Sequence, residues 1–117
     1  MTLGIALIKI PVDDLARSQP FYEALGLTFV FVSDEWGWAQ SEGTSPPVAL
    51  YVPGKGGGSG TPGGEIGIHF SHSDLEALAE QVGAAGGAAE IATNADGTRS
   101  LECRDPAGNL VRIMEAR

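Results

Sequence analysis

The chain repeats one pattern of residues sixty positions apart, and this repeat limits its fold more than any other feature. Residues 8–15, IKIPVDDL, correspond to residues 68–75, IHFSHSDL, and the register continues to Gly26 and Gly86. Each copy alternates apolar and polar residues, as a half-buried strand does, and then continues into an acidic turn and a helix that ends at glycine. A repeat of this size indicates one supersecondary unit used twice.

Each copy also contains three further strand candidates. In the first copy a strand over residues 4–12 is followed by a helix that runs from its expected N-cap, Asp13, to Gly26. Pro20 should kink this helix. Strands over 28–33, 36–40 and 48–52 follow. In the second copy a strand over 68–72 precedes a helix that opens with the capping box Ser73-x-x-Glu76 and ends at Gly83 or Gly86. Strands over 88–92, 99–104 and 110–115 complete this copy. The pattern predicts an α+β fold of two βαβββ modules.

A glycine-rich segment separates the two copies. Residues 54–64, GKGGGSGTPGG, carry a lysine near the beginning and lead into a strand, whereas a phosphate-binding loop carries its lysine near the end and leads into a helix. We therefore interpret this segment as a flexible linker. The expected organisation is a single domain with a first module at 1–53, a linker at 54–64 and a second module at 65–117.

Composition excludes several classes of function. The 117 residues carry a formal charge of −8, which argues against binding to nucleic acid because such binding relies on neutralising phosphates. No apolar run approaches the roughly 20 residues that span a bilayer, and the first ten residues lack the features of a signal peptide. Cys103 is the single cysteine, so no intrachain disulfide can form, and we expect it to be a small buried strand residue. These features favour a cytoplasmic protein without a membrane partner.

Several segments resemble the vicinal oxygen chelate superfamily, which includes glyoxalase I, extradiol dioxygenases, and fosfomycin- and bleomycin-resistance proteins. The similar segments are residues 12–22, VDDLARSQPFY, then Leu25-Gly26-Leu27, and residues 104–109, RDPAGN. The resemblance covers essentially the whole chain, but its motifs specify caps and turns, so they support a fold more strongly than an activity. It implies two βαβββ modules that form a curved mixed sheet around a cleft, commonly completed in a homodimer.

In the enzymes of this superfamily the cleft holds a divalent metal, and the resemblance implies that its ligands come from the first and last strands of each module. Leu7 and Gly67 occupy the two first-strand positions, and Arg112 occupies the position in the last strand where glutamate is frequent. Arginine is a permanent cation, and residues 49–52, ALYV, offer no carboxylate. We therefore expect no metal at the usual place and no cofactor, although a displaced site using His69 and Glu65 is an alternative.

Strand alternation places Lys9, His69 and Arg112 on the cleft side of their strands. Trp36, Trp38 and Tyr51 either pack in the core or reach the cleft as stacking surfaces for a planar ligand. The acidic surface favours a cationic ligand, whereas Lys9 and Arg112 would complement a carboxylate or phosphate, and the sequence leaves this conflict open. The candidate ligand-binding residues are thus Lys9, Trp36, Trp38, Tyr51, His69 and Arg112.

Three functional hypotheses follow. The first is a metal-free homodimer that binds or sequesters a small aromatic molecule such as an antibiotic. The second is a lyase, isomerase or dioxygenase of the same superfamily that uses a relocated metal or His69. The third is a regulatory or interaction module, which no residue pattern specifically supports. No other catalytic constellation stands out in the sequence.

Overall fold

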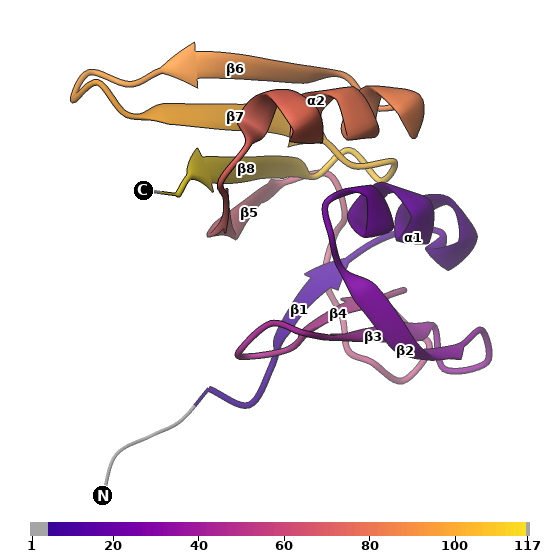
Figure 1. Cartoon of the computed structure of the whole chain (residues 1–117). Coiled ribbons are helices and arrows are strands. Elements are labelled where there is room, and N and C mark those ends of the chain that lie inside the picture. The colour runs from indigo at the N-terminus through magenta and orange to yellow at the C-terminus, as the bar shows by residue number, and fades with distance from the viewer. Residues whose placement is uncertain (1–4, 117) are drawn as a thin grey trace, which may run out of the picture.

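The computed structural model describes residues 5–116, apart from the side chains of residues 65 and 66, and consists of two modules of the same architecture (Figure 1). The first module contains β1 (Ile8–Pro11), α1 (Leu15–Ala24), β2 (Thr28–Ser33), β3 (Trp38–Glu42) and β4 (Val48–Tyr51). The second contains β5 (Glu65–His72), α2 (Leu75–Ala84), β6 (Ala89–Thr93), β7 (Arg99–Arg104) and β8 (Leu110–Glu115). The predicted α+β fold with two βαβββ modules is confirmed.

The strands form two four-stranded mixed sheets with the same topology. The strand order is β1-β4-β3-β2 in the first sheet and β5-β8-β7-β6 in the second. In each sheet the first strand of the module pairs in parallel with the last strand, and the other pairs are antiparallel. The repeat in the sequence is therefore a repeat of topology, with β1 and β5 as equivalent edge strands.

The helices begin one residue later than the sequence analysis expected. Asp14, not Asp13, is the N-cap of α1, and its carboxylate accepts hydrogen bonds from the backbone N–H groups of Ala16 and Arg17. Asp74, not Ser73, caps α2 and accepts from Ala77. A carboxylate at this position satisfies backbone donors that lack a partner within the helix, and each cap stabilises the helix by about 1 kcal/mol.

Several strands also differ from the expected ranges, and β1 spans only Ile8–Pro11. β3 begins at Trp38, because Gly37 takes a positive φ of 58° and turns the chain between the two tryptophans. Trp36 therefore lies outside the strand, and the prediction that both indoles share one strand is wrong. β5 begins at Glu65, three residues earlier than predicted. Pro20 lies within α1, which continues to Ala24.

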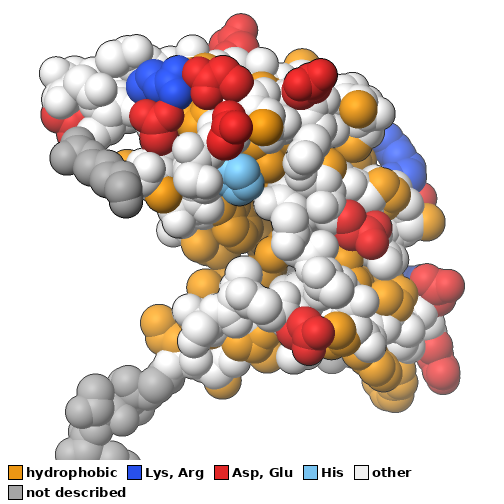
Figure 2. All heavy atoms as spheres, in the orientation of Figure 1, with side chains coloured by type: hydrophobic (Ala, Val, Ile, Leu, Met, Phe, Trp, Pro, Cys, Tyr) orange, Lys and Arg blue, Asp and Glu red, His pale blue; other side chains and the backbone are white. Residues whose placement is uncertain are grey.

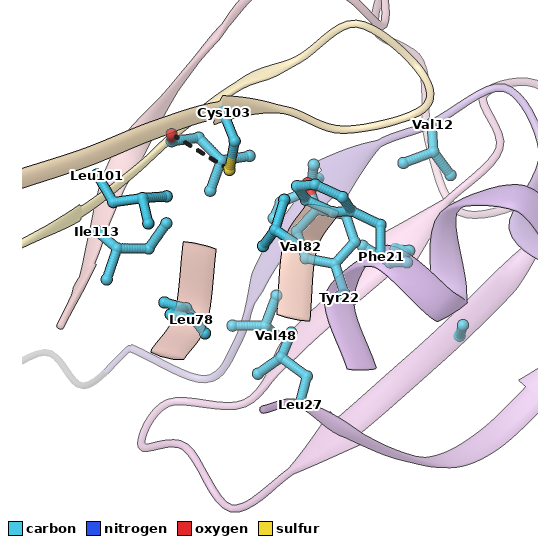
Figure 3. Packing of buried hydrophobic residues seen from close by; sticks show 14 of the residues in the cluster. Val12, Phe21, Tyr22, Leu27, Val48, Leu78, Val82, Leu101, Cys103 and Ile113 are labelled. Atoms are coloured by element: carbon cyan, nitrogen blue, oxygen red, sulfur yellow. Dashed lines mark hydrogen bonds between the residues drawn. The ribbon is translucent and has the colours of Figure 1, made fainter. Parts of the chain in front are cut away.

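A single hydrophobic cluster joins the two modules. It includes residues of α1, residues of α2 and residues of both sheets, and the two helices contact each other (Figure 3). The rings of Phe21 and Tyr22 meet edge to face with their centroids 5.1 Å apart. Aromatic pairs favour this arrangement because the positive edge of one ring meets the negative face of the other. The core sides of both sheets are thereby covered by the helices.

A buried hydrogen-bond network also connects the modules, at the turn between β7 and β8. Asp105 accepts hydrogen bonds from the Tyr22 hydroxyl at 2.6 Å and from the Asn109 side-chain amide at 2.9 Å. The same Asn109 amide donates to the carbonyl oxygen of Pro11 at 2.7 Å, and its Oδ1 accepts from the Gly63 N–H at 2.8 Å. Asp105 and Asn109 are both buried, so the turn of the second module is fixed to α1 and β1 of the first.

The space-filling view shows a hollow between the two modules, with hydrophobic side chains on its floor (Figure 2). Exposed apolar side chains also lie elsewhere on the described surface: Ile5, Leu7, Val30, Phe31, Val32, Trp36 and Met114 are each at least 36% exposed. Neither helix within residues 5–116 has the length and apolar composition to cross a membrane.

We expect the substitution Tyr22→Phe to destabilise the protein by about 1–3 kcal/mol, because it removes one donor from a buried carboxylate. Burial, together with the neighbouring charge of Asp105, holds the pKa of Tyr22 above its ordinary value, so the hydroxyl keeps its proton and remains a donor at neutral pH. Urea denaturation measures the change in the free energy of unfolding. Tyr51→Phe is the control, because its hydroxyl donates to the accessible carbonyl of Ser59. Equal stabilities of the two variants would contradict the role of the network.

Candidate ligand-binding site

The face of the second sheet that points away from the core carries both side chains predicted for the site in this module, His69 and Arg112. His69, Arg112 and Glu102 occupy neighbouring positions across β5, β8 and β7. Their neighbours along β7 and β8, Leu101, Cys103, Val111 and Ile113, point to the opposite side and are buried. We call the face that carries His69, Glu102 and Arg112 the open face of the second module.

This open face is hollowed into a cavity of about 640 Å³. The connection between β6 and β7 forms one wall, and His69, Arg112 and Met114 contribute to the floor. The Arg112 Nε donates to a carboxylate oxygen of Glu102 at 3.2 Å. Both side chains are about a third or more exposed, so this ion pair contributes little to stability and leaves polar groups in the cavity wall.

The equivalent face of the first module carries Lys9, Trp38 and Tyr51. Tyr51 pairs with Trp38 across β3 and β4 and with Pro11 on β1. The Lys9 ammonium lies 4.6 Å from the centroid of the Tyr51 ring, which is within the range of a cation–π interaction. The Trp38 indole donates to the side-chain oxygen of Gln40 at 3.2 Å. We call this surface the open face of the first module.

The glycine-rich segment crosses the open face of the first module. In Figure 1 the chain after β4 runs beside the first sheet before it reaches β5. Lys9 Nζ donates to the carbonyl oxygen of Gly57 at 2.6 Å, and the Tyr51 hydroxyl donates to that of Ser59 at 2.8 Å. Trp36, which is 59% exposed, lies beside Gly56. The segment thus contacts four residues of the site: Lys9, Trp36, Trp38 and Tyr51.

The first strands of the two modules meet at a cavity of about 210 Å³. Its lining includes Lys9 and Pro11 from β1, Gly67 from β5, and Asn109. Lys9 therefore lies close to one of the positions at which the superfamily's enzymes place a metal ligand. The structure groups Lys9, Trp36, Trp38 and Tyr51 around the glycine-rich segment, and it places His69 and Arg112 together in the larger hollow.

The residues present do not suit a divalent metal at the family position. Leu7 and Gly67 have no donor atom in their side chains, and Arg112 is a cation whose Nε is directed at Glu102. Divalent cations need several oxygen, nitrogen or thiolate donors that converge. Within residues 5–116, no group of three His, Cys, Asp or Glu side chains is arranged to hold a metal ion. The side chain of Glu65, which belongs to the alternative displaced site, lies outside the described structure.

Cys103 is a buried residue of β7, as predicted, and its position does not suit a nucleophile. Burial, together with the charge of Asp105, raises the pKa of its thiol to about 11. The thiolate is the reactive form of cysteine, so this shift suppresses reactivity at neutral pH.

We expect Cys103 to react slowly with Ellman's reagent in the native protein at pH 8. A pKa of about 11 in place of 9.0 leaves about a hundredfold less thiolate. Burial restricts access of the reagent further. Denaturation in urea should restore rapid labelling. Labelling of the native protein at the rate of the unfolded chain would contradict the buried position.

A family model matches residues 4–113 of the chain and describes the glyoxalase/bleomycin resistance protein/dioxygenase superfamily. The match spans nearly the whole chain, so the protein belongs to this superfamily. The resemblance inferred from its motifs is confirmed. A search of curated protein sequences finds no match.

Solved structures of superfamily members share the fold. A member from Sphaerobacter thermophilus superimposes with a TM-score of 0.79 at 23% identity, with 98% of each chain covered. A lactoylglutathione lyase from Agrobacterium tumefaciens gives a TM-score of 0.76 at 20% identity, covering 97% of this chain and 93% of that one. TnmS3, an antibiotic-binding protein from a Streptomyces species, gives 0.74 at 20% identity, covering 99% and 98%. At these identities the likeness establishes the fold alone.

Sequence reasoning did not identify two features of the site. Glu102, which pairs with Arg112, is two residues from the start of the RDPAGN motif, and its alternation in β7 could have placed it on the open face. The contact of Gly57 with Lys9 had no signal in the sequence, because the two residues are far apart along the chain.

Proposed function

We propose that this protein is a cytoplasmic homodimer that binds and sequesters a small aromatic molecule on its open faces without a metal ion. The observation that carries the proposal is the residue set around Lys9 and Arg112. The cation Arg112 occupies one position where the superfamily's enzymes place a metal ligand, and Lys9, Trp38 and Tyr51 lie on the equivalent face of the first module. The fold is kept, whereas Leu7, Gly67 and Arg112 cannot form the family's metal centre.

The first module supplies the aromatic part of the proposed site. Trp38 and Tyr51 lie next to each other across two strands, and Tyr51 supports the Lys9 ammonium. A planar ligand can stack on such rings, and each aromatic contact contributes about 0.5–1.5 kcal/mol beyond the area that it buries. Lys9 and Arg112 would bind a carboxylate or phosphate group of the ligand. The antibiotic-binding function of TnmS3 is a precedent for this use of the fold.

A second copy of the chain would complete the cleft. The open face of the second module is accessible, and apolar residues such as Phe31 and Met114 are exposed on the described surface. Exposed apolar patches of this kind are commonly covered at interfaces between proteins. The charge of −8 favours a small ligand over nucleic acid as the partner.

An enzyme that uses His69 is the second candidate function. His69 is exposed in the hollow of the second module, beside Arg112, where it could transfer a proton to or from a bound molecule. The lactoylglutathione lyase among the similar structures is a precedent for catalysis on this fold. If a reaction is found, His69→Ala should abolish it in a variant that still folds, and unchanged turnover would exclude His69.

Metal-free binding can be tested by thermal unfolding in the presence of naphthoate, a planar aromatic carboxylate. A ligand at a hundred times its Kd adds about 2.7 kcal/mol of stability, which raises the Tm of a domain of this size by roughly 10 °C. We expect this increase in wild-type protein with or without EDTA. We expect Lys9→Met to lose most of it.

Lys55→Met is the matched control, because it removes an exposed lysine whose ammonium donates to the backbone carbonyl of Asp34 at 3.5 Å. It should keep the response to naphthoate. Absence of stabilisation by naphthoate and by related aromatic acids would count against the proposal. So would a stoichiometric divalent ion in protein purified without chelator.

A further inference from the structure

Residues 56–60, which we call the strap, fit the open face of the first module so closely that a side chain is excluded at its glycine positions. A Cβ atom at Gly56 would lie 2.6 Å from Cε3 of Trp36, and one at Gly57 would lie 2.9 Å from Cε3 of Trp38. A Cβ at Gly60 would lie 2.5 Å from the Tyr51 hydroxyl oxygen. These distances are too short for real carbon contacts. The glycines are therefore a steric requirement of the packed strap and not only a source of flexibility.

The strap offers the open face the same chemical groups that a planar ligand would offer. Gly57 lies beside Trp38 and Tyr51, and its carbonyl oxygen accepts a hydrogen bond from Lys9. Lys9 also contacts the Tyr51 ring, so a cation, an aromatic surface and an acceptor meet at one point. A carboxylate oxygen is a stronger partner for an ammonium group than a neutral carbonyl, because both partners are then charged.

Few interactions hold the strap in place. Within the described structure, three hydrogen bonds involve its backbone: those from Lys9 and Tyr51, and one from the Gly54 N–H to the carbonyl oxygen of Gly58. Gly57 is half-buried, and the other four residues of the strap are exposed. A glycine-rich segment also gains much conformational entropy on release. Segments with few buried contacts open at low cost in free energy.

We propose that the strap is a built-in occupant of the ligand site, and that an aromatic carboxylate displaces it by taking over Lys9 from the Gly57 carbonyl. This inference rests on the proposed function and specifies the ligand class further, as a planar molecule with an anionic oxygen at its edge. It also resolves the conflict between an acidic protein and an anionic ligand. Lys9 is already directed at an acceptor, so its local contact and not the net charge selects the ligand.

The substitution Gly57→Ala tests the position of the strap without any ligand. Its Cβ would collide with Trp38, whereas one at Gly64 would meet nothing within 4 Å, and neither glycine has a positive φ. Gly64→Ala is therefore a matched control. The protein has two tryptophans, and both lie against the strap, so acrylamide quenching of their fluorescence reports its position. We expect stronger quenching in Gly57→Ala and wild-type quenching in Gly64→Ala.

Lys9→Met should release the strap from the open face by a second route, because it removes the hydrogen bond from Lys9 to the strap without adding an atom to the strap. It should also increase quenching. Cooperative thermal unfolding of each variant verifies that it is folded. Quenching equal to that of the wild type in both Gly57→Ala and Lys9→Met would overturn the proposed position of the strap.

Calorimetric titration with naphthoate tests displacement. If the closed strap is about ten times more populated than the open one, Gly57→Ala should bind naphthoate about tenfold more tightly than the wild type, and Gly64→Ala should bind like the wild type. Equal affinities of the wild type and Gly57→Ala would overturn displacement while leaving the proposed function intact. No binding to Gly57→Ala, whose face is open, would count against the proposed function and against displacement together.

Discussion

The buried hydrogen bonds of Asp105 and Asn109 determine how the two modules lie against each other. The carboxylate of Asp105 receives four hydrogen bonds, from the Tyr22 hydroxyl, the backbone N–H of Ala107, and the backbone and side-chain N–H groups of Asn109. Asn109 in turn bonds to Pro11 at the end of β1 and to Gly63 beyond the strap. Burying the Asp105 carboxylate without these donors would cost free energy, so the two modules have one favourable arrangement at this contact. That arrangement holds β1 next to β5 and fixes the chain at the far end of the strap.

The site follows from this arrangement. Because β1 is held beside β5, Lys9 reaches the cavity that Gly67 lines. The chain leaves β4 after Tyr51 and is fixed again at Gly63, so the strap between these points lies across Trp38 and Tyr51. The same scaffold that brings metal ligands together in the superfamily's enzymes here brings together a lysine, two aromatic rings and a backbone carbonyl. The change of residues, not of fold, supports the proposal of a binder.

The repeat predicted the fold well because strand alternation and helix ends are encoded locally. It even contains the correct helix caps, since Asp14 and Asp74 are the acids that both copies share, although Asp13 and Ser73 were equally plausible without the contacts of the folded chain. The strap could not be predicted, because a run of glycines has the composition of a linker, and its partners Lys9 and Trp38 are distant in sequence. The RDPAGN motif was recognised as a turn. Its bond to Tyr22 depends on tertiary structure.

The central claim is that a small aromatic anion and the strap compete for the same surface. Hydrogen–deuterium exchange of the wild-type protein, with and without saturating naphthoate, measures this most directly. Competition predicts faster exchange in residues 54–60 when naphthoate is bound, above all at the Gly54 amide, because release of the segment breaks its hydrogen bond to the carbonyl oxygen of Gly58. Slower or unchanged exchange in these residues with naphthoate bound would contradict the account, because it would mean that the strap covers the ligand or never leaves the sheet.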